Sequence, residues 1–211
     1  MIRGVEIEVS RETVWVRSGE PLRVVSSAFV GGELGVTRHI LNMHWPHGHC
    51  EGLDVHLRAF ARGRGIDEPF VGLMSAAATQ NATPVTEAAD GISVTAVVTV
   101  AIGTPVSAGA SPPASWRPST INAIVLLDAR LESAAGINGV ITATEAKVGA
   151  LADARVVTAD GAPATGTVTD AVVIAWTGRG PTLPYLGPGA VGGWLLARAV
   201  RRAVTEGIAR A

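Results

Sequence analysis

Alternating apolar and polar residues predict several β-strands along the chain. The clearest strand is the segment 91–102, in which every second residue is apolar and would lie on one face: Ile92, Val94, Ala96, Val98 and Val100. The segment 5–16, VEIEVSRETVWV, predicts two short strands around a turn at Ser10–Glu12. Apolar runs predict further extended segments at 22–29, 38–45, 69–77, 120–131 and 169–176. We expect the segment 120–131 to pair with 91–102 as an antiparallel neighbour.

Helical spacing of apolar residues predicts three helices. The segment 52–65 places three apolar residues on one face, namely Leu53, Leu57 and Phe60. A helix over about 132–154 would turn this set inward: Ile137, Val140, Ile141, Val148 and Leu151. The C-terminal helix, about 189–209, would expose Arg198, Arg201 and Arg202 and bury Leu196, Ala197, Val200, Val204 and Ile208. We therefore expect one α+β domain over residues 1–211, with a mixed, largely antiparallel sheet packed against a few helices, the C-terminal helix included.

Composition narrows the functional classes. The 211 residues are 47% hydrophobic, so we expect one domain with a full hydrophobic core. The formal net charge is −1, and the sequence has no basic patch of the kind that binds nucleic acid. The single cysteine, Cys50, cannot form an internal disulfide, which fits a reducing compartment. The N-terminus has no signal-peptide pattern, and the longest apolar runs are too short to span a membrane. We expect a cytoplasmic protein with no membrane or nucleic-acid partner, and a homo-oligomer is compatible with this composition.

All five histidines lie between His39 and His56, which raises the possibility of a metal site. In an extended segment His47 and His49 would point to one side and His44 to the other. No carboxylate or second cysteine completes a known ligand spacing, so we favour a solvated loop and predict no metal site. Cys50 as a nucleophile would need a base and an oxyanion hole, which the sequence does not reveal.

Polar residues cluster at the entrances of two predicted strands. The segment 164–171, ATGTVTDA, precedes the apolar run AVVIAW, and STIN (119–122) precedes AIVLL. A phosphate-binding loop would need a lysine and a following helix, and ATGTVTDA has neither. Asp170 is therefore either a carboxylate that satisfies turn amides or a binding or catalytic group.

The predicted helix 132–154 carries the polar segment ITATEAK. On a helical wheel Thr144 falls within the apolar stripe, and Glu145 and Lys147 lie at its two edges, where they could line a pocket. The alternative is a threonine that bonds back to its own helix, with Glu145 and Lys147 solvated. The glycines of YLGPG (185–189) precede the C-terminal helix, where backbone amides could hold an oxygen.

Seven motifs in order resemble the adenosylcobinamide amidohydrolase family of cobalamin salvage: SSAFVGG, ILN, EPFVGLMSAA, STINAIVL, ITATEAK, ATGTVTDAVVIA and YLGPGAVGG. The resemblance spans about Ser26–Gly193. It implies an amide hydrolase that removes the aminopropanol arm of adenosylcobinamide, a small-molecule corrinoid substrate, and leaves adenosylcobyric acid. Cobalt belongs to that substrate, and no protein cofactor is implied. Three positions depart from the family pattern: Val30, Val168 and Ala190 stand where Asn, Gly and Thr are usual.

Amide hydrolysis needs a nucleophile, a proton donor for the amine and donors for the oxyanion. We expect Asp170 or Glu145 to activate water and Lys147 to stabilise the oxyanion or protonate the amine, so the catalytic candidates are Asp170, Glu145, Lys147 and Thr144. The substrate-binding candidates are Ser27, Asn42, Thr120, Asn122, Thr167, Thr169, Tyr185 and Gly187. A rival scheme uses Thr144, Thr167 or Ser27 as the nucleophile. Two other functions stay open: a non-catalytic corrinoid-binding protein, and a metal-dependent amidohydrolase with another substrate.

Overall fold

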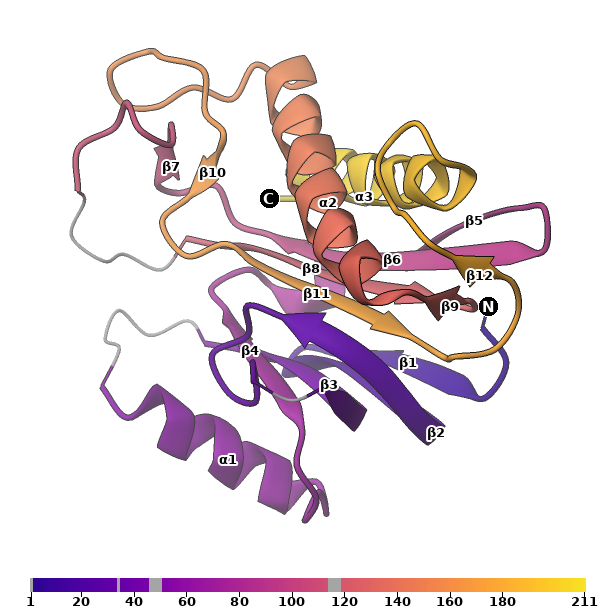
Figure 1. Ribbon diagram of the computed structural model, residues 1–211. Coiled ribbons are helices and arrows are strands. Elements are labelled where there is room, and N and C mark those ends of the chain that lie inside the picture. The colour runs from indigo at the N-terminus through magenta and orange to yellow at the C-terminus, as the bar shows by residue number, and fades with distance from the viewer. Residues whose placement is uncertain (1, 34, 46–50, 114–118) are drawn as a thin grey trace.

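A computed structural model describes residues 2–33, 35–45, 51–113 and 119–211 (Figure 1). The main strands are β1 Val5–Val9, β2 Thr13–Ser26, β3 Val36–His44, β4 Val71–Ser75, β5 Val85–Ala89, β6 Ile92–Val100, β8 Ile121–Leu127 and β11 Ala171–Trp176. Four two-residue strands are β7 Pro105–Val106, β9 Arg130–Leu131, β10 Gly166–Thr167 and β12 Thr182–Leu183. The helices are α1 Leu53–Gly63, α2 Ser133–Asp153 and α3 Val191–Ile208, with a short 3-10 turn at Thr79–Asn81.

The main strands form one mixed sheet in the order β4-β3-β2-β11-β8-β6-β5, with β1 beside β2. Its β3–β4 and β8–β11 pairs are parallel and the other pairs are antiparallel, including the predicted pair of β6 and β8. The α+β prediction is confirmed. The two strands expected near residues 13–16 and 22–29 are one long strand, β2, whose register against β3 shifts between Arg17 and Leu22.

The two halves of this sheet pack face to face. Buried residues of β2 and β3, such as Val16 and Ile40, share a core with Val97 of β6 and Ile124 and Leu126 of β8. A second core lies between the β6–β8–β11 half and helices α2 and α3, and a third lies between β2–β4 and α1. The molecule is thus a single compact domain of four layers, with helices outside and strands inside (Figure 1). No helix in the described ranges is long and apolar enough to cross a membrane.

Helix α3 buries the predicted face, but the predicted inward face of α2 is only partly right: Leu151 is buried and Val140 packs against the core, whereas two other members of the set are exposed. Ile137 and Ile141 are 54% and 51% exposed. Small residues make up much of the buried face instead: Ala135, Gly136, Gly139, Ala143, Ala146 and Ala150. A Cβ atom on Gly136 would lie 3.1 Å from Val25 Cγ1, and one on Gly139 would lie 3.2 Å from Leu186 Cδ1. The two glycines let this part of the helix approach its neighbours so closely that the nearby Ile137 and Ile141 side chains point outward.

Candidate active site

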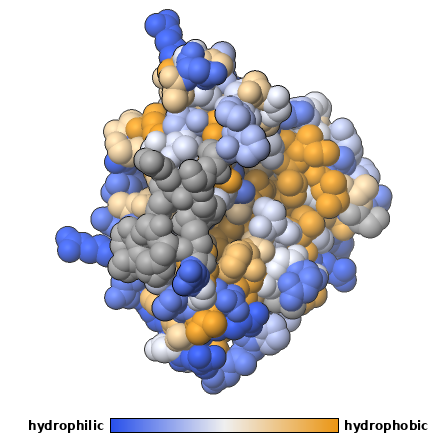
Figure 2. Space-filling model, turned by 90° about the vertical axis from the view of Figure 1, so that its left-hand side faces the viewer, coloured by the Kyte–Doolittle hydropathy of each residue, from blue (hydrophilic) through white to orange (hydrophobic). Residues whose placement is uncertain are grey.

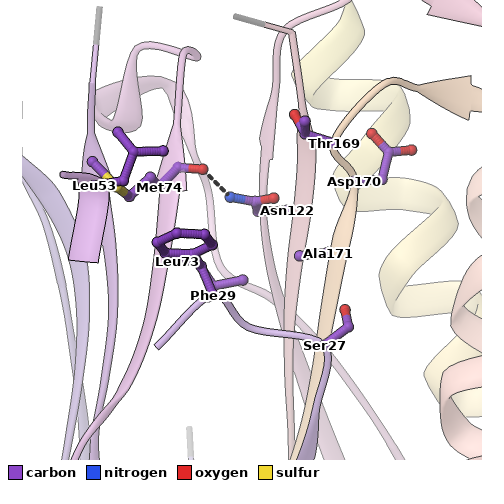
Figure 3. A pocket seen from close by; sticks show the side chains of 9 residues that line it. All are labelled: Ser27, Phe29, Leu53, Leu73, Met74, Asn122, Thr169, Asp170 and Ala171. Carbon is purple, nitrogen blue, oxygen red and sulfur yellow. Dashed lines mark hydrogen bonds between the residues drawn. The ribbon is translucent and has the colours of Figure 1, made fainter. Parts of the chain in front are cut away.

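A pocket of about 220 Å³ opens where β4, β8 and β11 meet the start of α1. It lies on the face that Figure 2 turns toward the viewer, where apolar side chains gather in and beside a hollow. Its described lining, drawn in Figure 3, is Ser27, Phe29, Leu53, Leu73, Met74, Asn122, Thr169, Asp170 and Ala171. A smaller recess of about 30 Å³ adjoins it, shares Leu53, Met74 and Thr169, and adds Ser75 and Thr120.

A buried amide and hydroxyl network forms the floor of the pocket. Asn122 Nδ2 donates to Met74 O at 2.8 Å and to Asn42 Oδ1 at 3.0 Å, and Thr120 Oγ1 donates to Asn122 Oδ1 at 2.8 Å. Asn42 Nδ2 donates in turn to Thr99 Oγ1 at 2.9 Å. These bonds connect β3, β4, β6 and β8, so they join the two halves of the sheet at the pocket. Because both amide hydrogens of Asn122 are used, this residue shapes the floor in the unliganded protein.

The carboxylate of Asp170 lies between α2 and the strand entrances. Its Oδ1 accepts from Ile121 N at 2.9 Å and Thr167 Oγ1 at 2.5 Å, and its Oδ2 accepts from Lys147 Nζ at 2.5 Å and Thr167 N at 3.1 Å. The Asp170 and Lys147 side chains are each 12% exposed. A carboxylate has about four lone-pair sites, and four donors occupy them here. Among the described residues that line the pocket and the recess, Asp170 is the only ionisable one.

The two polar strand entrances lie side by side. Ala171 of β11 is the parallel partner of Asn122 of β8. Thr167 Oγ1 and Thr169 Oγ1 both donate to Ser119 O, at 2.8 and 2.9 Å. The segments STIN and ATGTVTDA therefore form one wall. The single hydroxyl proton of Thr167 has two acceptors, Ser119 O and the Asp170 carboxylate, so it can turn from one to the other.

The structure brings eight of the twelve candidate residues together. Five line the pocket or the recess, namely Ser27, Thr120, Asn122, Thr169 and Asp170. The other three lie behind this lining and bond to it: Asn42 to Asn122, and Lys147 and Thr167 to Asp170. The structure does not bring the remaining four to the pocket lining. Thr144 and Glu145 are exposed on α2, and Thr144 Oγ1 donates to Val140 O at 2.8 Å, the back-bonded alternative. Tyr185 is 54% exposed beside Gly187 in the segment before α3.

The described histidines have other partners. His44 Nδ1 donates to Ala77 O at 2.7 Å, and His39 lies between the indole N–H of Trp15 and the carboxylate of Glu68. His47, His49 and Cys50 lie outside the described residues. Within the described part of the chain, no three His, Cys, Asp or Glu side chains are grouped so that they could hold a metal ion.

Sequence reasoning missed the apolar part of the lining, namely Phe29, Leu53, Leu73, Met74 and Ala171. It searched for groups that perform chemistry, whereas much of a small-molecule site is apolar surface. A signal was present, because Phe29 lies two residues after Ser27 within the motif SSAFVGG.

Comparison with known proteins agrees with the motif resemblance. No curated protein matches the chain. Among solved structures, the PH0078 protein from Pyrococcus horikoshii OT3 matches with a TM-score of 0.56 and 13% identity, over 99% of this chain and 80% of that one, which shows a shared fold. The model of the CbiZ family, adenosylcobinamide amidohydrolase, matches residues 1–211. Because that match covers the whole chain, the protein belongs to the adenosylcobinamide amidohydrolase family.

Proposed function

We propose that this protein hydrolyses the amide bond that holds the aminopropanol arm of adenosylcobinamide and releases aminopropanol and adenosylcobyric acid. Membership of the amidohydrolase family over residues 1–211 supports the reaction class. The observation that links the proposal to particular residues is the Asp170–Lys147 pair: Asp170 supplies an anion at the wall of the pocket, and Lys147 is the cation bonded to it from behind.

The size of the pocket defines which part of the substrate it takes. Sites for drug-sized ligands usually enclose about 300–1,000 Å³. A corrinoid is larger than such a ligand, and the pocket holds about 220 Å³. The pocket therefore suits the amide arm, while the corrin ring stays at the mouth.

The chemistry follows from the hydrogen bonds of Asp170. In the resting arrangement its four acceptor sites are filled, so a water molecule needs one of them to be vacated. The Thr167 hydroxyl can vacate Oδ1 by donating to Ser119 O alone. Asp170 then takes a proton from water, the water oxygen bonds to the amide carbon, and the tetrahedral intermediate collapses as the C–N bond breaks. Lys147 stabilises the oxyanion or transfers the proton to the leaving amine.

The test is release of aminopropanol from adenosylcobinamide by the purified protein. We expect release by the wild type and by the Glu20→Gln control, whose carboxylate is exposed, and a loss of about 10²-fold or more in Asp170→Asn. No release with any cobinamide form would overturn the proposal.

The filled acceptor set of Asp170 also favours a second candidate, a corrinoid-binding protein without catalysis. A carboxylate that stays fully bonded anchors its neighbours and activates no water. Tight binding of adenosylcobinamide without any aminopropanol release would select this candidate over the hydrolase.

A further inference from the structure

Phe29 is a large apolar side chain that the fold leaves exposed at the pocket. It is 61% exposed, and it is the only aromatic residue among the nine described residues that line the pocket. Figure 3 shows its ring turned toward the pocket from the side opposite Thr169 and Asp170. Single exposed apolar residues are common on protein surfaces, so exposure alone indicates no role.

The backbone that carries Phe29 is fixed on both sides. Val30 N donates to Gly72 O at 3.0 Å and Gly72 N donates to Val30 O at 2.8 Å, which attaches the turn to β4. On the other side Val172 N of β11 donates to Ser27 Oγ at 3.0 Å. The turn thus bridges two strands of the sheet, and Phe29 lies between its two attachment points.

The turn also requires glycine at positions 31 and 32. A Cβ atom on Gly32 would lie 2.6 Å from Ala28 O, and Gly31 has φ 69°, a conformation that costs glycine little. Ala28 N further donates to Ser26 Oγ at 2.8 Å. The backbone that carries the ring is therefore held in place, so a ligand that packs on Phe29 has little backbone to order.

We propose that Phe29 is a specificity-determining residue that stacks on a conjugated ring of the substrate at the pocket mouth. The inference rests on the proposed function, which leaves the ring system of the corrinoid outside a pocket of about 220 Å³. Two parts of the substrate offer such a ring, the corrin macrocycle and the adenine of the adenosyl ligand. Both present a π face to an aromatic side chain, and the test separates them.

The experiment measures binding of the reaction product, because adenosylcobyric acid keeps both rings and cannot be hydrolysed again at the same bond. Dissociation constants are measured by equilibrium dialysis for wild type, Phe29→Leu and Phe29→Tyr. Leucine keeps an apolar side chain but removes the π face, and tyrosine keeps the face. We expect Phe29→Leu to bind on the order of tenfold more weakly and Phe29→Tyr to bind within about twofold of wild type.

Two controls define the outcome. Trp194→Leu removes an exposed aromatic residue of α3 that lies outside the pocket lining, and it should bind the product as wild type does. Equal melting temperatures show that the variants fold. Dicyanocobyric acid, which lacks adenosine, identifies the ring: an equal loss in Phe29→Leu assigns the corrin, and a loss confined to the adenosyl form assigns the adenine.

Either pattern supports the stacking role. Unchanged product affinity in Phe29→Leu, with a wild type that hydrolyses adenosylcobinamide, overturns the role of Phe29 and leaves the proposed function intact. A wild type that neither binds nor hydrolyses any corrinoid overturns both.

Discussion

Removal of the Lys147 ammonium is the most direct test of the site, and its cost can be worked from the structure. In Lys147→Met the stem remains, and Asp170 loses one of its four donors while the pair is only 12% exposed. Loss of one partner from a buried ion pair typically costs about 3–5 kcal/mol, and residual exposure argues for the lower end, about 3 kcal/mol. For a chain of this size, that corresponds to a fall of roughly 6–12 °C in Tm.

Two comparisons make the measurement specific. Arg201 and Asp153 form an ion pair at 2.6 Å that also involves α2, but their side chains are 47% and 60% exposed. Arg201→Met should therefore cost under about 1 kcal/mol. In the double variant Lys147→Met/Asp170→Asn the loss should be smaller than the sum of the single losses by about 1 kcal/mol or more, since no unpaired charge is left. Urea unfolding and calorimetry give these values, and equal costs for Lys147→Met and Arg201→Met would refute the reasoning.

Three further variants test the ion pair at the pocket, the buried network of its floor and the packing at the start of α3. Gly166→Ala would place a Cβ against Asp170 Oδ2 and Lys147 Nζ, so we expect at least a tenfold loss of aminopropanol release, whereas Gly103→Ala, with open space around it, should keep wild-type rates. Asn122→Leu leaves buried polar partners unsatisfied and should lower the unfolding free energy by about 2–5 kcal/mol in urea; a loss below about 1 kcal/mol would contradict the network. Gly193→Ala would press a Cβ onto the carbonyl oxygens of residues 186 and 187 and should lower Tm by several degrees, with an unchanged Tm as the contrary result.

Much of the fold follows from periodicity. The alternation of 91–102 and the apolar run of 120–131 identify β6 and β8, and the spacing of α3 identifies its buried face. Strand β5 was not predicted, although the sequence carries a signal for it: the dipeptide Asp90-Gly91 favours the tight turn of a two-residue hairpin. In the structure these two residues form that turn between β5 and β6, with φ values of 52° and 74°. The face of α2 could not be predicted from hydrophobicity, because close approach of backbone to sheet selects the small residues.

The site was predictable where the chain itself places residues side by side. The polar segments STIN and ATGTVTDA, both noted at strand entrances, lie side by side because they precede neighbouring parallel strands. The sequence placed Lys147 at the edge of the apolar stripe of α2, but it could not predict the ion pair with Asp170. That contact depends on how the helix is rotated over the sheet. Thr144 and Glu145 were predicted to line the site because the helical wheel placed the exposed residues Ile137 and Ile141 on the buried face.

The pairing of β2 with β11 has a consequence for how the chain is synthesised. Residues Arg23–Ser26 pair with Val173–Trp176, and Ser27 bonds to Val172 across 145 positions. During translation the edge of β2 that pairs with β11 stays unpaired until β11 has left the ribosome, and unpaired strand edges favour aggregation. The pocket is therefore completed late, and a nascent chain that stalls before β11 would be a substrate for chaperones rather than a partly active enzyme.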